Sequence, residues 1–227
     1  MTWPLVAIVG IGIVLAGRSS SSRISSLAIM RAVAKEIDRE GWTTSRNYKL
    51  PDFHKELDKE LDAHSFTKAG KAAVLANLAF ESGFFWYVKE QGNLDEKGDR
   101  YQRNPALGNT EPGDGKRYIG RGFIQLTGRK NYTDAGSALS LPLVDRPELA
   151  EQKPVEVSFW YLENYKARDT GRTCFDVAQN ETDVEKACAS VAGIIFAGRE
   201  QVSDSLKEKG SFAKRQRYSK VIFEQLS

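Results

Sequence analysis

Two glutamates near the middle of the chain have the residue type and surroundings for acid–base chemistry. Glu81 ends an apolar helical stretch, where the partial negative charge of the last carbonyl groups disfavours a carboxylate. The aromatic run 84–87 follows directly, and desolvation by its rings would favour the neutral carboxyl group further. A neutral carboxylic acid is what a glycosidic oxygen needs as proton donor. The alternative is a solvated glutamate at a helix end.

Glu90 follows nine residues later in the polar stretch 89–93, where nothing should raise its pKa. We therefore expect an ionised carboxylate. Two carboxyl groups in contrasting environments suit a general acid paired with a general base. The alternative for Glu90 is an exposed surface charge.

A glycine-rich segment at residues 113–132 supplies uncharged polar groups. Its glycines let backbone and ligand approach closely, and Gln125, Thr127 and Asn131 offer the neutral donors and acceptors that sugar recognition uses. The segment lacks the Gly-Lys-Ser/Thr ending of a phosphate loop. Thr127 is alternatively the N-cap of a helix beginning near Gly128.

The elements that would position these residues are mostly helical. Residues 84–122 are rich in Gly, Asn, Asp and Pro, which predicts a long loop with one small β-hairpin. A loop of that length is usually functional. The sequence thus predicts one mainly α domain at 24–227, in which the hairpin and loop region lines a cleft. Apolar residues recur at helical spacing over 24–40, 53–61, 68–82, 128–140, 154–166, 183–197 and 212–226.

Residues 1–23 form a separate apolar segment and serine-rich linker. The run 3–17 would span about 22 Å as a helix, less than the roughly 30 Å of a bilayer core. It is interpreted as an uncleaved membrane anchor, a signal-peptide core or a buried helix. The anchor is favoured because no basic residue precedes the run. The basic residues that follow would hold the domain in the cytoplasm, whereas a wall-degrading enzyme must act outside it. We expect attachment or export to the cell envelope, or a place in a virion.

Composition narrows the function classes. The 227 residues carry a net charge of +3, too small and scattered for nucleic-acid binding. Cys174 and Cys188 have no zinc-site spacing, and a disulfide or two buried free thiols both remain open. With His54 and His64 as the only histidines, no metal or cofactor is expected.

Two motifs resemble one enzyme family. Ala-Phe-Glu-Ser-Gly at 79–83 and the long segment 118–132 are similar to glycoside hydrolase family 19, a group of chitinases and phage endolysins with a lysozyme-like α+β fold. The resemblance covers roughly residues 65–200. It implies an inverting hydrolase with Glu81 as general acid, Glu90 as general base and Thr127 holding the attacking water. It also implies sugar-binding positions at Gln125 and Asn131, with Tyr118 and Arg121 shaping the cleft.

The chain departs from the family pattern at three places. Phe80 stands where His is common, Phe84 replaces a second Gly, and Val191-Ala192-Gly193 replaces an Asn-Gly-Gly segment. These changes bear on sugar-site affinity and substrate choice more than on the reaction.

Peptidoglycan is the first predicted substrate, because the nine-residue gap resembles the endolysin branch and the N-terminal run suits wall lysis. Inversion requires the two carboxyl groups to lie about 6.5–9.5 Å apart. Chitinase activity is the alternative within the same chemistry. A non-catalytic wall-binding or virion structural protein is the alternative from another class.

Overall fold

The computed structural model describes residues 25–37 and 40–226. The predicted N-terminal helix, the linker and the anchor at 3–17 lie outside the described residues, so the domain boundary at residue 23 stays a prediction. Among the described residues, no helix combines the length and apolar character that a membrane crossing requires.

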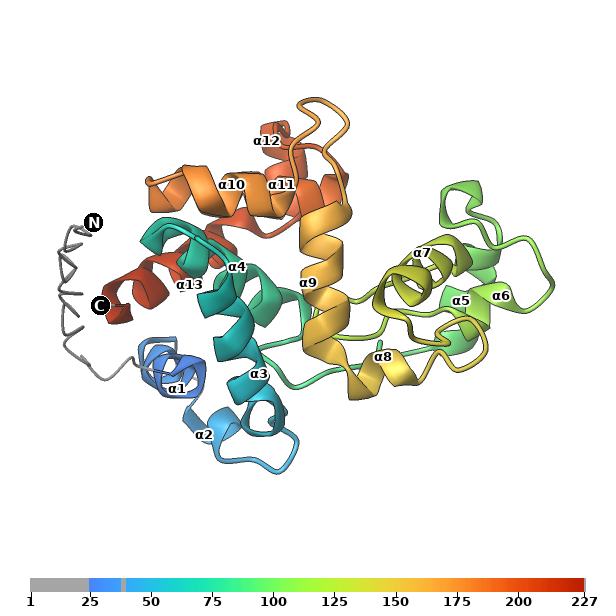
Figure 1. Ribbon diagram of the computed structural model, residues 1–227, viewed down its shortest axis with the longest axis horizontal. Helices are drawn as coiled ribbons and strands as arrows, with labels where there is room; N and C mark the ends of the chain where they lie inside the picture. The colour runs from blue at the N-terminus through green and yellow to red at the C-terminus, as the bar shows by residue number, and fades with distance from the viewer. Residues whose placement is uncertain (1–24, 38–39, 227) are drawn as a thin grey trace, which may run out of the picture.

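The described chain is a succession of helices joined by turns (Figure 1). In chain order they are α1 (Ser26–Glu36), α2 (Glu40–Thr43), α3 (Leu50–Ala63), α4 (Lys68–Glu81), α5 (Leu94–Gln102), the 3-10 helix η1 (Pro105–Leu107), α6 (Asp114–Arg117), α7 (Arg129–Leu139), α8 (Leu149–Gln152), α9 (Pro154–Asn164), α10 (Cys174–Asn180), α11 (Val184–Ala197), α12 (Asp204–Lys209) and α13 (Phe212–Gln225). The mainly α class predicted from apolar spacing is confirmed. Each helix predicted from that spacing has a counterpart in this order.

The predicted small hairpin in the 84–122 region is reduced to isolated antiparallel bridges. The described residues contain no strand there, and two isolated bridges, Lys89 with Arg121 and Arg121 with Leu126, are the only β pairing between them. Residues 94–102 instead form α5, which buries only Gly98 and so has no apolar periodicity to detect. Its start was nonetheless readable, because the Asn93 side chain caps it and acidic residues occupy its first turn.

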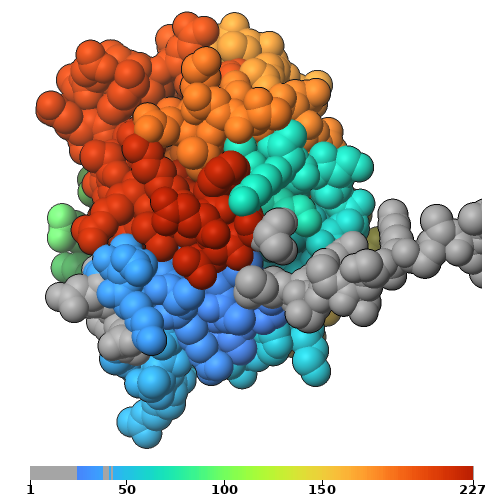
Figure 2. All heavy atoms as spheres, turned by 90° about the vertical axis from the view of Figure 1, so that its left-hand side faces the viewer, coloured from blue at the N-terminus to red at the C-terminus, as the bar shows by residue number. Residues whose placement is uncertain are grey.

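Helix α4 is the centre of the larger helical group. It contacts α10, α11 and α13, and most of its residues are buried. Its small side chains let neighbouring backbones come close: a Cβ on Gly70 would lie 1.9 Å from the carbonyl oxygen of Ala178 in α10. The C-terminal helix α13 packs against α1, α4 and α11, and its residues fill the middle of the face shown in Figure 2.

Helix α9 joins this group to the rest of the fold. In Figure 1 it stands between the α1–α4 and α10–α13 group and the smaller α5–α8 group. It contacts α3 and α10 on one side and α7 and α8 on the other. The groups therefore share one framework, and residues from both can face a common groove.

The two cysteines are buried free thiols, as one of the two sequence interpretations held. Cys174 lies in α10 and Cys188 in α11. Burial raises the pKa of the Cys188 thiol to about 11, which keeps it protonated and unreactive at neutral pH.

Candidate active site

The chain reverses sharply directly after Glu81, the last residue of α4. Gly83, Phe84 and Phe85 all adopt left-handed backbone conformations, with φ of 59°, 65° and 61°. The Ser82 hydroxyl stabilises the turn, donating to the carbonyl of Leu78 at 2.6 Å and accepting from the amide of Phe85 at 2.8 Å. The turn thus separates the Glu81 side chain from the rings that follow it.

The predicted crowding of Glu81 by the aromatic run is wrong for most of the run. Phe84 is 1% exposed, and its ring lies against those of Tyr48 and Tyr218. Phe85 is fully buried against Phe123. These rings belong to the core, and Tyr87 is the member of the run that lines a pocket together with Glu81.

Glu81 instead contacts a buried cation. The Arg215 Nη2 atom lies 2.6 Å from Glu81 Oε1, and the Arg215 side chain is 2% exposed. The guanidinium group also donates to Asn77 Oδ1 and to the Gly210 carbonyl, both at 2.9 Å, and lies over the Phe80 ring. The Glu81 carboxyl group thus has a charged side chain within hydrogen-bond distance. The surroundings of Glu81 are therefore not the purely apolar ones expected.

Glu90 is pinned by three donors. The Tyr101 hydroxyl donates to Oε1 at 2.7 Å, Lys97 Nζ lies 2.9 Å from the same oxygen, and the Gly120 amide donates to Oε2 at 3.1 Å. Burial alone would raise the pKa of Glu90, but the hydroxyl, the ammonium group and the amide outweigh it, so the pKa lies below its usual value. The expected ionised state agrees with this direction, although its cause is a set of donors and not free solvation.

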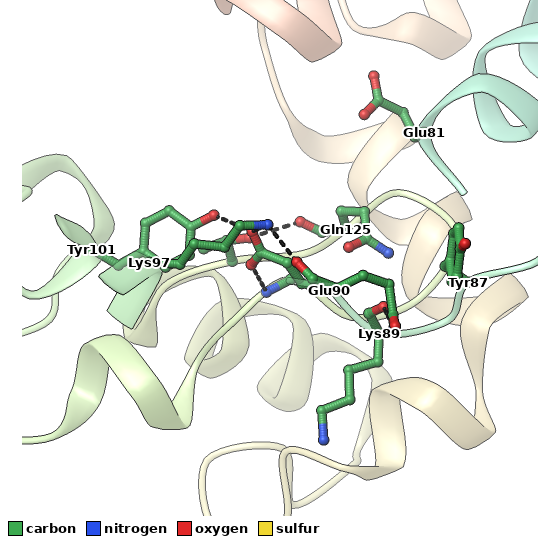
Figure 3. Close-up of a pocket in the computed structure, with 10 residues that line it drawn as sticks. Glu81, Tyr87, Lys89, Glu90, Lys97, Tyr101 and Gln125 are labelled. Carbon is green, nitrogen blue, oxygen red and sulfur yellow. Dashed lines mark hydrogen bonds and ion pairs between the residues drawn. The ribbon is translucent and has the colours of Figure 1, made fainter. Parts of the chain in front are cut away.

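Glu81 and Glu90 face one pocket of about 330 Å³, drawn in Figure 3. Glu81 comes from the end of α4 on one side, and Glu90 from the connecting segment on the other. A second pocket of about 690 Å³ shares Glu81, Gln125 and Thr127 with the first. Because they share this wall, the two pockets form one groove with Glu81 at the junction. The remaining residues of the first pocket are Tyr87, Lys89, Gln91, Lys97, Tyr101 and Gly120.

The predicted polar positions Gln125, Thr127 and Asn131 all lie in this groove. Gln125 and Thr127 line both pockets, and Asn131 lines the larger one. The Thr127 hydroxyl donates to the carbonyl of Gln125 at 2.8 Å. It does not cap α7, whose N-cap is Gly128 without a side-chain hydrogen bond. The capping alternative for Thr127 is therefore wrong.

Tyr118 and Arg121 are not among the residues that line either pocket. Tyr118 is 1% exposed, and its hydroxyl donates to the Val144 carbonyl at 3.0 Å. Arg121 is 7% exposed and pairs with Glu151 at 2.8 Å while donating to the Tyr132 hydroxyl at 3.0 Å. Both side chains hold the glycine-rich segment in place from the interior, and their predicted part in shaping the cleft stays a prediction.

Several groove residues were missed from sequence. Lys97 and Tyr101 are four positions apart on α5, a spacing that puts both on one helix face, but α5 itself was not predicted. Arg215 reaches Glu81 from α13, and no local pattern marks it. Helix α9 and the residues after it add the wall of the larger pocket, with Trp160, Tyr161, Asn164, Tyr165 and Lys166.

The described residues contain no group of three or more His, Cys, Asp or Glu side chains arranged to hold a metal ion.

The helical fold with a groove between two carboxylates is the lysozyme-like architecture that the motifs predicted. The chain belongs to glycoside hydrolase family 19, because the family described as chitinase class I matches residues 39–194, more than half of its length. In structure it resembles chitinase C from Streptomyces griseus, with a TM-score of 0.63 and 21% identity over 89% of this chain and 94% of that one. At that identity the likeness shows the fold alone.

Several plant endochitinases are similar to this chain in sequence. A basic endochitinase of Brassica napus is 32% identical over 110 residues, which is 45% of this chain and 38% of the relative. An endochitinase of Arabidopsis thaliana is 34% identical over 122 residues, 50% of this chain and 40% of the relative. A protein named as an inactive endochitinase of Arabidopsis thaliana is 38% identical over 88 residues, covering 39% of this chain and 29% of that protein. The chain thus spans about two fifths or less of the length of these relatives, and one of them is described as inactive.

Proposed function

We propose that this chain hydrolyses β-1,4 bonds between N-acetylated sugars by an inverting acid–base mechanism. The observation that carries the proposal is that Glu81 and Glu90 open onto one pocket from opposite walls, each held in a different electrostatic setting. Family membership supports a glycosidase, and the pocket supplies the two carboxyl groups that this reaction needs.

Glu81 is the proposed general acid. Arg215 contacts Oε1, which leaves Oε2 as the oxygen that can present a proton to the leaving glycosidic oxygen. The guanidinium group, itself fixed by Asn77, holds the carboxyl group in one orientation. Orientation of this kind is a large part of what a catalytic group contributes.

Glu90 is the proposed general base. Its lowered pKa keeps it ionised, as a base that takes a proton from water must be. Thr127 lines the same pocket, and its hydroxyl already donates to the Gln125 carbonyl, so its lone pairs can accept from the attacking water. Attack from the Glu90 side with departure toward Glu81 inverts the anomeric carbon.

Two polymers are candidates for the substrate. The names of the relatives support chitin. Peptidoglycan has a separate observation in its favour: the larger pocket contains the charged side chains Lys130, Asp134 and Lys166. Peptidoglycan carries ionisable peptide substituents on its sugars, whereas chitin is uncharged. The endolysin-like role, with attachment to the cell envelope through residues 3–17 or a place in a virion, is part of the peptidoglycan candidate.

The test offers the purified full chain both polymers. NMR of the products should show inverted configuration at the anomeric carbon, and the fragment masses should identify the bond that is cut. Glu81→Gln should lower the rate at least about 100-fold, as should Glu90→Gln, while circular dichroism shows the fold intact. Glu81→Gln with near-parental turnover would remove its acid role. Pull-down by either polymer without product release from the parent chain would favour the non-catalytic alternative.

A further inference from the structure

Two side chains of α5 hold the proposed base, and neither belongs to the motifs that carry the family resemblance. Lys97 and Tyr101 both contact Glu90 Oε1, at 2.9 and 2.7 Å. We propose that Lys97 and Tyr101 form a clamp that positions Glu90, leaving Oε2 as the oxygen that takes the proton from the attacking water. The inference rests on the proposed function, and it adds positioning residues to that site.

The hydrogen-bond capacity of the carboxylate supports the choice of oxygen. Each carboxylate oxygen can accept about two hydrogen bonds. The two clamp residues fill the capacity of Oε1, whereas the Gly120 amide uses only one position on Oε2. Among the described contacts, the remaining acceptor position of Glu90 is therefore on Oε2.

Helix α5 and its contacts hold the two clamp residues in place. Lys97 and Tyr101 are one helical turn apart, so both extend from the same face of α5 toward Glu90 (Figure 3). Lys97 Nζ also donates to the Gln91 carbonyl at 2.6 Å, and this contact ties α5 to the segment that bears Glu90. Asn93 caps the helix at the near end, which holds its first turn in place.

The same contacts set the charge of the base. Both clamp residues donate to Glu90 and favour its ionised form. Burial and the hydrogen bond to Glu90 raise the pKa of Tyr101, so Tyr101 stays a donor across the working pH range. The other titratable groups around the carboxylate are Tyr87 and Lys89 on its own segment, Glu81 across the pocket at the end of α4, and Tyr132 of α7.

The experiment measures Glu90 directly and through catalysis. In full-length protein with ¹³C-labelled glutamate carboxyl groups, the Glu90 signal is identified by its loss in Glu90→Gln. Lys97→Met and Tyr101→Phe should each raise its titration midpoint. In both variants the acid limb of the kcat–pH profile should also move to higher pH, because a base with a higher pKa is protonated earlier as pH falls. Lys97→Arg, which keeps a cation and donors, should restore much of the parental profile.

Lys116→Met is the matched control. Lys116 pairs with Asp95 at 3.0 Å, so this variant removes a lysine ion pair to α5 without touching Glu90. Unchanged Glu90 midpoints in both clamp variants would overturn the proposal, as would an equal shift in Lys116→Met. The proposed function fails by a different result, namely a parent chain without hydrolysis or an active Glu90→Gln. In that case the carboxyl titration still tests the clamp.

Discussion

At the scale of single residues, the backbone of Gly120 contacts Glu90 twice. The Glu90 amide donates to the Gly120 carbonyl at 2.8 Å, and the Gly120 amide returns a hydrogen bond to Glu90 Oε2. A Cβ at this position would lie 2.8 Å from Gln125 Oε1 and 3.4 Å from Glu90 Oε2. Glycine leaves this space open, whereas a side chain would push the end of the Gln125 side chain aside and lie beside the proposed base.

Gly120→Ala tests the role of this open space. The added methyl group displaces the end of the Gln125 side chain, so we expect kcat to fall about tenfold, with little loss of stability because that side chain can shift. Steady-state kinetics and thermal unfolding measure both. Gly41→Ala is the control, since its Cβ would meet nothing within 4 Å. Parental kcat in Gly120→Ala would show that the close approach has no catalytic role.

At the scale of elements, the turn after α4 combines strain with burial. Left-handed backbone costs roughly 1–2 kcal/mol for a residue with a side chain. Phe84 and Phe85 adopt it while being almost fully buried, and each buried ring contributes about 1.5–3 kcal/mol. Burial therefore outweighs strain, which explains how Phe can stand where the family commonly has a second glycine.

The two contributions can be separated by a pair of substitutions. Phe84→Ala and Phe84→Gly lose the same ring, but only glycine relieves the positive φ, so the glycine variant should be the more stable by roughly 0.5–1 kcal/mol. Chemical unfolding of both variants measures the difference. At Leu75, buried inside α4, the order should reverse, with alanine more stable by about 1 kcal/mol. The same order at both positions would contradict strain in the turn.

At the scale of the whole molecule, the large exposed hydrophobic side chains lie on the groove. Tyr87 and Phe196 are 39% and 42% exposed, the two large hydrophobic residues with such exposure within the described chain. Tyr87 lines the smaller pocket and Phe196 the larger one. Exposed aromatic surface at a pocket is typical of a ligand contact, so we expect both rings to stack on sugar units.

Replacing either ring by alanine should weaken substrate binding without unfolding the protein. Tyr87→Ala and Phe196→Ala should each raise KM about fivefold, equivalent to roughly 1 kcal/mol of lost contact. Kinetics on soluble oligosaccharides give KM, and thermal unfolding checks stability. Phe223→Ala is the control, because Phe223 lies under Lys68 and does not line either pocket. Unaltered KM in both groove variants would show that neither ring contributes to substrate binding.

The sequence by itself determined the mainly helical class and the central groove residues. Apolar spacing located the helices because burial of one face repeats with the helical period. Glu81, Gln125 and Thr127 came from the two motifs that carry the resemblance, Glu90 came from its polar surroundings and its nine-residue spacing from Glu81, and all four line one pocket. Helix α5 escaped because it buries almost nothing, and periodicity reports only burial.

The tertiary structure alone decided what each carboxylate touches. Arg215 reaches Glu81 from α13, and Lys97 reaches Glu90 from α5, while Arg121 turns into the interior to pair with Glu151. In the sequence alone these basic residues carry the same formal charge, and nothing nearby in the chain tells which partner each one contacts. Which of them meets a carboxylate, and which is buried, depends on how distant helices pack. Electrostatic contacts act over a few ångströms in space, whatever the separation along the chain.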